Sequence, residues 1–91
     1  MNEIKNVEIP TSFDLKLIVQ KIEKVSGQKA KFDTYLKQEY LMGSNVTEEH
    51  LLDVGFKFVE YGQYNHYPIY KYGDILAIYI GNVLHVMKEN G

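Results

Sequence analysis

Apolar side chains recur at helical spacing early in the chain and alternate with polar ones later. The first helical pattern is formed by Leu15, Ile18, Val19, Ile22 and Val25, with lysines and other polar residues on the opposite arc. Thr11 or Ser12 is the expected N-cap, and the Ser26-Gly27 pair is the expected end. This pattern predicts one amphipathic helix that is followed by a glycine C-cap.

Two more helical segments are expected before the pattern changes at Gly55. Residues 29–42 carry Phe32, Leu36 and Tyr40 at helical spacing. The run that begins at Ala30 alternates like a strand, but the length of the segment favours a helix. Thr47 is the expected N-cap of a short helix that ends at Gly55. Residues 12–54 are therefore predicted to be the helical part of the chain.

After Gly55 the apolar residues alternate, and turn signals appear at regular intervals. The pattern predicts strands at residues 56–61, 67–72, 75–80 and 83–88, joined in part by the two-residue turns Gly73-Asp74 and Gly81-Asn82. These turns place Tyr70 opposite Ala77 and His85 opposite Ile78. The expected fold class is α+β, with two or three N-terminal helices followed by a three- to four-stranded antiparallel β-meander. We expect a single domain, 1–91, that begins with a loose arm at residues 1–10.

The expected register sorts the strand residues onto two faces, and neither face is polar. One face carries Ile69, Lys71, Leu76, Ile78, Ile80, Val83, His85 and Met87; the other carries Tyr70, Tyr72, Ile75, Ala77, Tyr79, Leu84, Val86 and Lys88. We expect the helices to cover the first face, so that Leu76 and Ile78 belong to the core. The tyrosine face is then exposed to solvent, partly covered, or in contact with another subunit. A homodimer through a sheet face is one such contact.

Five of the eight tyrosines lie between Tyr61 and Tyr72. A tyrosine ring buries apolar area while its hydroxyl keeps a hydrogen bond, which suits recognition surfaces. The candidate binding residues are Glu60, Tyr61, Tyr64, His66, Tyr67, Tyr70 and Tyr72. Packing within the sheet is the main alternative role for the tyrosines. Stacking on nucleic-acid bases is a weaker alternative, because Lys71 falls on the other face.

Charge and composition narrow the classes of partner. The formal net charge of −2 gives no general attraction to nucleic acid or anionic lipid. All ten basic residues are lysines, so no guanidinium can grip a phosphate or a guanine with two hydrogen bonds. Cysteine is absent, and neither a signal peptide nor a run of roughly 20 apolar residues occurs. We expect a cytoplasmic protein without a membrane segment.

No arrangement of residues indicates catalysis or a metal site. His50, His66 and His85 lack ligand spacing, and His85 lies among aliphatic residues, as a structural histidine does. The carboxylates Glu48, Glu49 and Asp53 are expected to cap and solubilise the short helix. The glycines form no phosphate-binding loop. We therefore expect no enzyme, no cofactor and no bound metal.

The run from Thr47 to Phe56, followed by strands that carry tyrosine and lysine, resembles short uncharacterised accessory proteins of bacteriophages and mobile elements. The resemblance extends over about half of the chain and is one of pattern. It implies a small cytosolic protein that acts by binding, such as an inhibitor or regulator of a host or defence enzyme. A protein-interaction module is therefore the leading interpretation, and a nucleic-acid or nucleotide-binding protein is the alternative.

Overall fold

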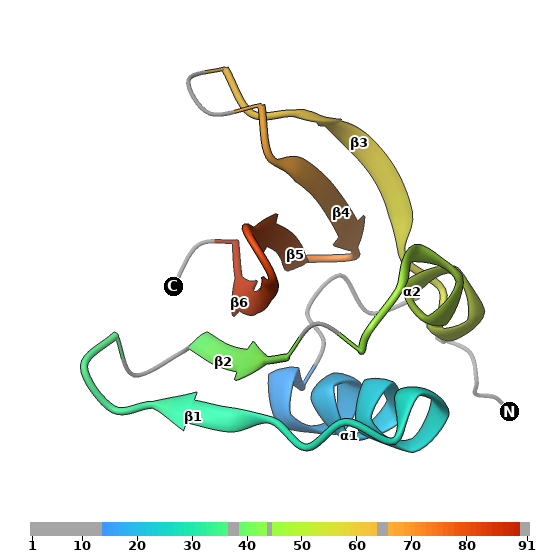
Figure 1. Ribbon diagram of the computed structural model, residues 1–91, viewed down its shortest axis with the longest axis vertical. Helices are drawn as coiled ribbons and strands as arrows, with labels where there is room; N and C mark the ends of the chain where they lie inside the picture. The colour runs from blue at the N-terminus through green and yellow to red at the C-terminus, as the bar shows by residue number, and fades with distance from the viewer. Residues whose placement is uncertain (1–13, 37–38, 44, 64–65, 90–91) are drawn as a thin grey trace, which may run out of the picture.

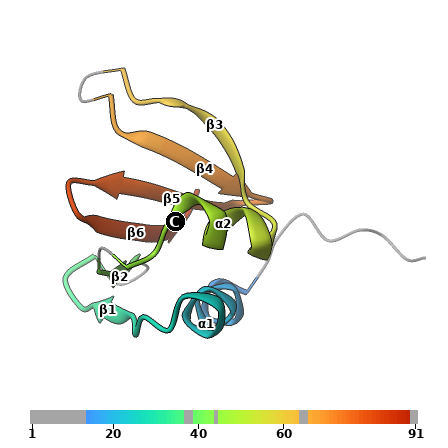
Figure 2. The same ribbon diagram turned by 45° about the vertical axis from the view of Figure 1, so that its right-hand side comes forward.

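The structure is a computed structural model that describes residues 14–36, 39–43, 45–63 and 66–89. These residues form two helices and six strands in the order α1 (Leu15–Ser26), β1 (Lys31–Asp33), β2 (Glu39–Met42), α2 (Glu48–Val54), β3 (Lys57–Tyr61), β4 (Pro68–Tyr72), β5 (Ile75–Ile80) and β6 (Val83–Lys88). The strands make one antiparallel sheet in the order β1-β2-β6-β5-β4-β3, and both helices lie on the same side of it (Figures 1 and 2). The α+β class is confirmed, but the sheet has more strands than expected.

Helix α1 begins after Asp14, whose extended backbone and side chain make it the N-cap. The Asp14 carboxylate accepts a hydrogen bond from the Lys16 N–H at 2.9 Å. The predicted cap, Thr11 or Ser12, is therefore wrong: the helix begins later than expected and Asp14 caps it, whereas residues 11 and 12 lie outside the described residues. At the other end Gly27 has φ 73°, a left-handed conformation that glycine adopts without strain. The predicted end of this helix is confirmed.

The helix predicted for residues 29–42 is wrong, because this segment forms the β1–β2 hairpin. The Asp33 carboxylate accepts hydrogen bonds from the N–H groups of Tyr35 and Leu36, which turns the chain directly after β1. Strand β2 then pairs with β6, far away in the sequence, and this pairing buries Met42. Packing against a distant strand outweighs the helical spacing of the apolar residues.

Helix α2 has the predicted N-cap, Thr47, and ends at Gly55. The Nδ1 atom of His50 accepts a hydrogen bond from the Thr47 N–H at 3.0 Å. A glutamate or glutamine usually makes this contact in a capping box. His50 therefore helps to fix the start of the helix.

The four strands that follow α2 confirm the predicted meander and its register. Tyr70 pairs with Ala77, and Ile78 pairs with His85. Gly73 and Gly81 adopt φ 61° and 65°, as the first positions of tight hairpin turns require. The predicted arm at residues 1–10 lies outside the described residues.

The face that the helices cover is the tyrosine face, so the expected assignment of the two faces is wrong. Ile75, Ala77, Leu84 and Val86 on this face are each 0% exposed. The tyrosine hydroxyls find partners at the rim of the core: Tyr79 donates to the Val46 carbonyl, and Tyr70 donates to Glu48 Oε2 at 2.8 Å. Because their hydroxyls are satisfied, these rings can be buried.

The opposite side of the sheet is named the open face here, because no described helix covers it (Figure 2). It consists of Lys31, Asp33, Glu39, Leu41, Lys57, Glu60, Ile69, Lys71, Leu76, Ile78, Ile80, Val83, His85 and Met87. His85 is bonded through Nδ1 to the carboxylate of Glu39, which is only 7% exposed. One ring nitrogen of His85 therefore has a partner within the sheet, as we expect of a structural histidine.

Candidate functional site

The structure divides the predicted binding residues between core and surface. Tyr70 is 5% exposed, so it is a core residue rather than a surface anchor. Tyr72 is half-buried, and its ring packs edge-on against Phe56 with the centroids 5.5 Å apart. Both tyrosines serve the packing of the helix-covered face. The predicted contact role therefore remains open for other members of the segment.

The remaining predicted residues lie on the β3–β4 hairpin or in its loop. Glu60, Tyr61 and His66 are exposed, and Tyr67 is half-buried. Tyr64 lies outside the described residues. Glu60 pairs with Ile69 and belongs to the open face, whereas Tyr61 pairs with Pro68 on the helix side. The structure thus does not bring all these residues onto one surface.

A β-bulge in β3 decides which side chains come together. Phe58 pairs with Tyr70, but the next register partners are Glu60 and Ile69, so Val59 is an extra residue. This insertion moves Tyr61 to the same side as Phe58, because strand residues otherwise alternate between faces. The two rings are edge-on with centroids 5.0 Å apart.

The resulting surface is named the hairpin patch; it consists of Phe58 and Tyr61, which share one side of the sheet, together with the bulged residue Val59 between them in the chain. The side chains of Phe58, Val59 and Tyr61 are 42%, 50% and 61% exposed. Strand β3 is an edge of the sheet, and the hairpin extends away from the body of the molecule in Figure 1. An aromatic pair therefore lies partly exposed on an edge strand, where a large partner can reach it, and Phe58 also packs edge-on against Tyr70 with the ring centroids 5.6 Å apart.

The loop of this hairpin is closed by backbone hydrogen bonds. The Gly62 N–H donates to the Tyr67 carbonyl at 2.9 Å, and the His66 N–H donates to the Gly62 carbonyl at 3.0 Å. His66 has φ 58°, in the left-handed region that histidine adopts more readily than most residues. These bonds hold the two strands together next to the hairpin patch.

The ionisable groups behind the patch act as fixed hydrogen-bond donors. Burial raises the pKa of Tyr70 to about 12, and its hydrogen bond to Glu48 acts in the same direction. Burial, followed by the charge of Glu48, also raises the pKa of Tyr79 to about 12. Both phenols are therefore neutral at physiological pH, and the Glu48 carboxylate is engaged as an acceptor. The group therefore contributes packing and hydrogen bonds to the covered face.

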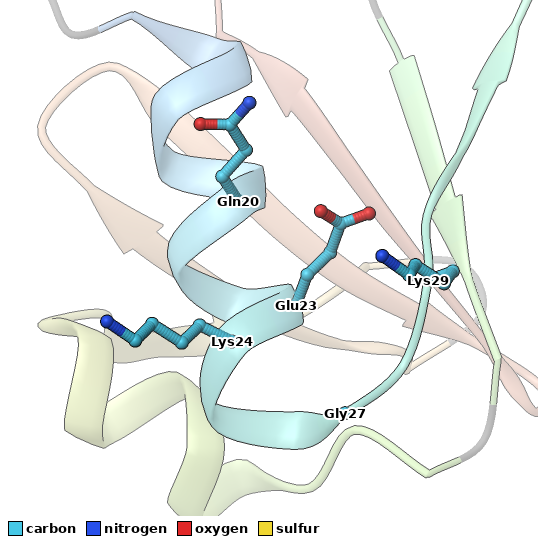
Figure 3. Close-up of a pocket in the computed structure, with 5 residues that line it drawn as sticks. All are labelled: Gln20, Glu23, Lys24, Gly27 and Lys29. Carbon is cyan, nitrogen blue, oxygen red and sulfur yellow. The ribbon is translucent and has the colours of Figure 1, made fainter.

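A shallow hollow of about 340 Å³ lies beside the end of α1. Figure 3 shows its lining residues, Gln20, Glu23, Lys24, Gly27 and Lys29, with Lys24 extending away from the side on which Glu23 and Lys29 lie. Glu23 Oε2 accepts a hydrogen bond from the Ala30 N–H at 2.8 Å, so this carboxylate ties the next segment to the helix. The side chains do not converge on one point, as the polar groups of a ligand site would.

A second hollow, of about 310 Å³, lies at the margin of the open face. Lys31, Leu41 and Val83, which belong to the open face, line part of it. It is a continuation of that face and not a separate cavity.

The described part of the chain offers neither a metal site nor a membrane span. No group of three or more histidine, aspartate or glutamate residues there is placed to hold a metal ion. No helix among the described residues has the length and apolar character that crossing a membrane requires.

Phe58 is the surface residue that the sequence pattern did not single out. Its alternation with Phe56 predicts a strand, but it does not indicate which side is exposed. Val59 is an ordinary strand residue, so no sequence signal marks the bulge. The pairing of Phe58 with Tyr61 can be recognised only from the register of β3 against β4.

Comparisons with protein-family models, with curated proteins and with solved structures each found no match for this chain.

Proposed function

We propose that this chain is a small cytoplasmic protein-interaction module that binds another protein through the hairpin patch. The observation that carries the proposal is the exposed pair of rings, Phe58 and Tyr61, held 5.0 Å apart on a projecting edge. Aromatic side chains are the most frequent energetic anchors of protein interfaces. Single exposed apolar residues are ordinary, but a cluster on a projection is typical of an interaction site.

Aromatic anchoring is favoured over the addition of a strand from the partner. Strand β3 has a described neighbour only on its β4 side, so its other edge could pair with an extended peptide. The bulge at Val59 interrupts the regular ladder that such a peptide would need. The rings therefore supply the main contact in this proposal.

An inhibitor or regulator that occupies the surface of a host or defence enzyme is the specific form we propose for this function. That form comes from the resemblance to phage and mobile-element accessory proteins, and a rigid projecting anchor is compatible with it. Nucleic acid is a weaker candidate, because Lys57 and Lys71 face away from the hairpin patch and the sequence contains no arginine.

The proposal can be tested by affinity capture from the source cells with wild-type protein and with the Phe58→Ser/Tyr61→Ser variant as baits. Tyr35→Ser is the matched control, because Tyr35 is an 88% exposed aromatic residue at a distant turn. A partner that the wild type and the control capture should be lost with the double variant. Each single substitution should then weaken its Kd by about 30-fold or more, as removal of a hot-spot anchor does.

Circular dichroism of each bait should show that the fold is retained. Equal capture by the double variant would refute the hairpin patch as the binding surface. If the captured material were nucleic acid, and its affinity fell steeply with salt, the alternative function would be supported instead.

A further inference from the structure

The open face carries an aliphatic centre that no described segment covers. This centre is formed by Leu41, Ile69, Leu76, Ile78, Ile80, Val83 and Met87. Ile80 and Val83 are each 37% exposed. An antiparallel sheet with one wet side usually has polar residues on that side, and a contiguous apolar area marks an interaction surface.

Charged residues lie at the margins of this face. In each of two rows across the sheet, the acidic and the basic residues lie at opposite ends. One row across the sheet, read from β1 to β3, is Asp33, Glu39, Met87, Leu76, Lys71 and Lys57. The next row in the same direction is Lys31, Leu41, His85, Ile78, Ile69 and Glu60. The first row runs from acidic to basic, and the second runs from basic to acidic. Each row is therefore complementary to its own reverse.

We infer that the open face binds a second copy of this chain around a two-fold axis that lies parallel to β5 and β6 and between them. Such an axis places each row against itself in the opposite direction. Lys31 then faces Glu60 of the second copy, and Leu76 faces Met87. Because the contact is isologous, every pair occurs twice.

The charges orient this dimer, and the aliphatic centre stabilises it. Lys71 Nζ lies 2.9 Å from Glu89 Oε1 of its own chain, and the two side chains form an exposed ion pair. Exposed pairs contribute little energy, but they exclude arrangements that place like charges together. Glu39 is held by His85 and keeps its position in the row that faces Lys71 of the second copy.

The proposed axis also agrees with the twist of a β-sheet. Rotation about a strand direction produces a second sheet of the same hand, so facing strands stay nearly aligned, as in sandwiches with about 10 Å between sheets. A face of six strands is roughly 25–30 Å wide and about 20 Å deep, which gives on the order of 500 Å². Standard interfaces bury about 800 Å² per partner, so we expect a Kd in the micromolar range.

A two-fold axis perpendicular to the strands is the main competing arrangement. It would place Lys31 against Asp33 and Lys57 against Glu60, but it would set Glu39 and Lys71 opposite aliphatic residues. The arrangement along the strands matches both complete rows and is therefore preferred.

Sedimentation velocity of the full chain over about 1–500 μM tests the dimer around the expected micromolar Kd. The mass should rise towards twice the 10.6 kDa of one chain. Leu76→Lys, at the centre of the open face, should raise the Kd by about 100-fold or more, because it places a charge in the buried part of the contact. Tyr35→Ser should leave the Kd unchanged, and circular dichroism should show a folded chain in each variant.

A charge exchange tests the axis. Lys31→Glu and Glu60→Lys should each raise the Kd about three- to tenfold, since each affects two symmetric pairs. The double variant should return to within about twofold of wild type. With the perpendicular axis the double variant would instead place the introduced glutamate near Asp33 and the introduced lysine near Lys57, and the loss would add.

The inference would be overturned if the chain were a monomer at every concentration, or if Leu76→Lys did not affect the dimer. The proposed axis would be overturned by an additive loss in the double variant. Dimer loss in Phe58→Ser/Tyr61→Ser alone would also overturn it, because that patch lies on the other side of the sheet. Partner capture by the Leu76→Lys variant tests the hairpin patch separately. The two proposals can therefore fail independently.

Discussion

Replacing Leu84 or Leu76 by alanine tests which side of the sheet forms the core. Leu84 is 0% exposed and belongs to the cluster that contains Ile18 and Ile22 of α1. Leu76 is half-buried on the open face. The two substitutions remove the same atoms, so a difference in the free energy of unfolding reports only on their surroundings.

Truncation of a fully enclosed leucine costs about 3–5 kcal/mol, because the lost transfer energy is increased by the cavity that remains. We expect about 3 kcal/mol for Leu84→Ala. Leu76→Ala should cost about 1 kcal/mol, since part of its side chain is already in contact with water and no closed cavity forms. A domain of this size has a total stability on the order of 5–10 kcal/mol, so the first variant should still fold.

Urea denaturation followed by far-UV circular dichroism measures both values, and repeating it at about 2 and 50 μM protein shows any contribution from association as a shift of the midpoint. With a slope of about 1–1.5 kcal/mol per molar urea, the midpoint for Leu84→Ala should fall by roughly 2–3 M. If Leu84→Ala unfolds the chain, Ile75→Val provides a milder test in the same core, with an expected loss of about 1 kcal/mol. An equal or larger loss for Leu76→Ala would refute the assignment of the two faces.

Two further predictions concern the phenols and the cap of α1. The pKa values of Tyr70 and Tyr79 lie at about 12 in the folded chain, above the ordinary value of 10.0. The folded state therefore favours the neutral phenols, and their contribution to the free energy of unfolding should be complete below pH 10 and lost as the pH rises through 12. Ultraviolet absorbance of the phenolates should show two late-titrating groups that ionise as the chain unfolds, and ionisation of all phenols near pH 10 with the fold intact would contradict this. Asp14→Ala should destabilise the protein by about 0.5–2 kcal/mol in thermal denaturation. Asp14→Asn should cost less, because asparagine keeps an oxygen acceptor for the Lys16 N–H. Equal losses for the two variants would count against Asp14 as the cap.

The register of the last four strands could be predicted because it is set locally. Gly73 and Gly81 specify tight turns, and a two-residue turn determines which residues lie opposite one another. The same register does not indicate which side the helices cover. On the covered side, the hydroxyls of Tyr70 and Tyr79 donate to groups that lie 22 and 33 residues away in the sequence. Such contacts leave no periodic signal.

The β1–β2 hairpin was not predicted, because one of its two strands pairs with a strand far away in the sequence. Glu39 and His85 are 46 residues apart, yet they form one buried pair across β2 and β6. A carboxylate and an imidazole in otherwise apolar strands are a weak signal for such a pairing. Helical spacing within residues 29–42 was the stronger local pattern, and it was misleading.

The candidate site was predicted only in part. Tyr61 is exposed, as a contact residue must be, whereas Tyr70 is buried. The tyrosine-rich composition pointed to the β3–β4 hairpin, but it could not separate rings that are buried from rings that are exposed. The bulge at Val59 places Tyr61 on the same side of the sheet as Phe58 and Tyr70, and this placement depends on backbone pairing rather than on residue type.

The position of β6 has a consequence for the synthesis of this protein. Strand β6 lies between β2 and β5, yet it follows every other described strand in the sequence. The hairpins β1–β2 and β3–β4–β5 therefore leave the ribosome before the strand that joins them. Until residues 83–88 emerge, β2 and β5 each have one unpaired edge, and unpaired edges promote association between chains. The sheet can be completed only after residues 83–88, the strand that joins its two halves, have left the ribosome.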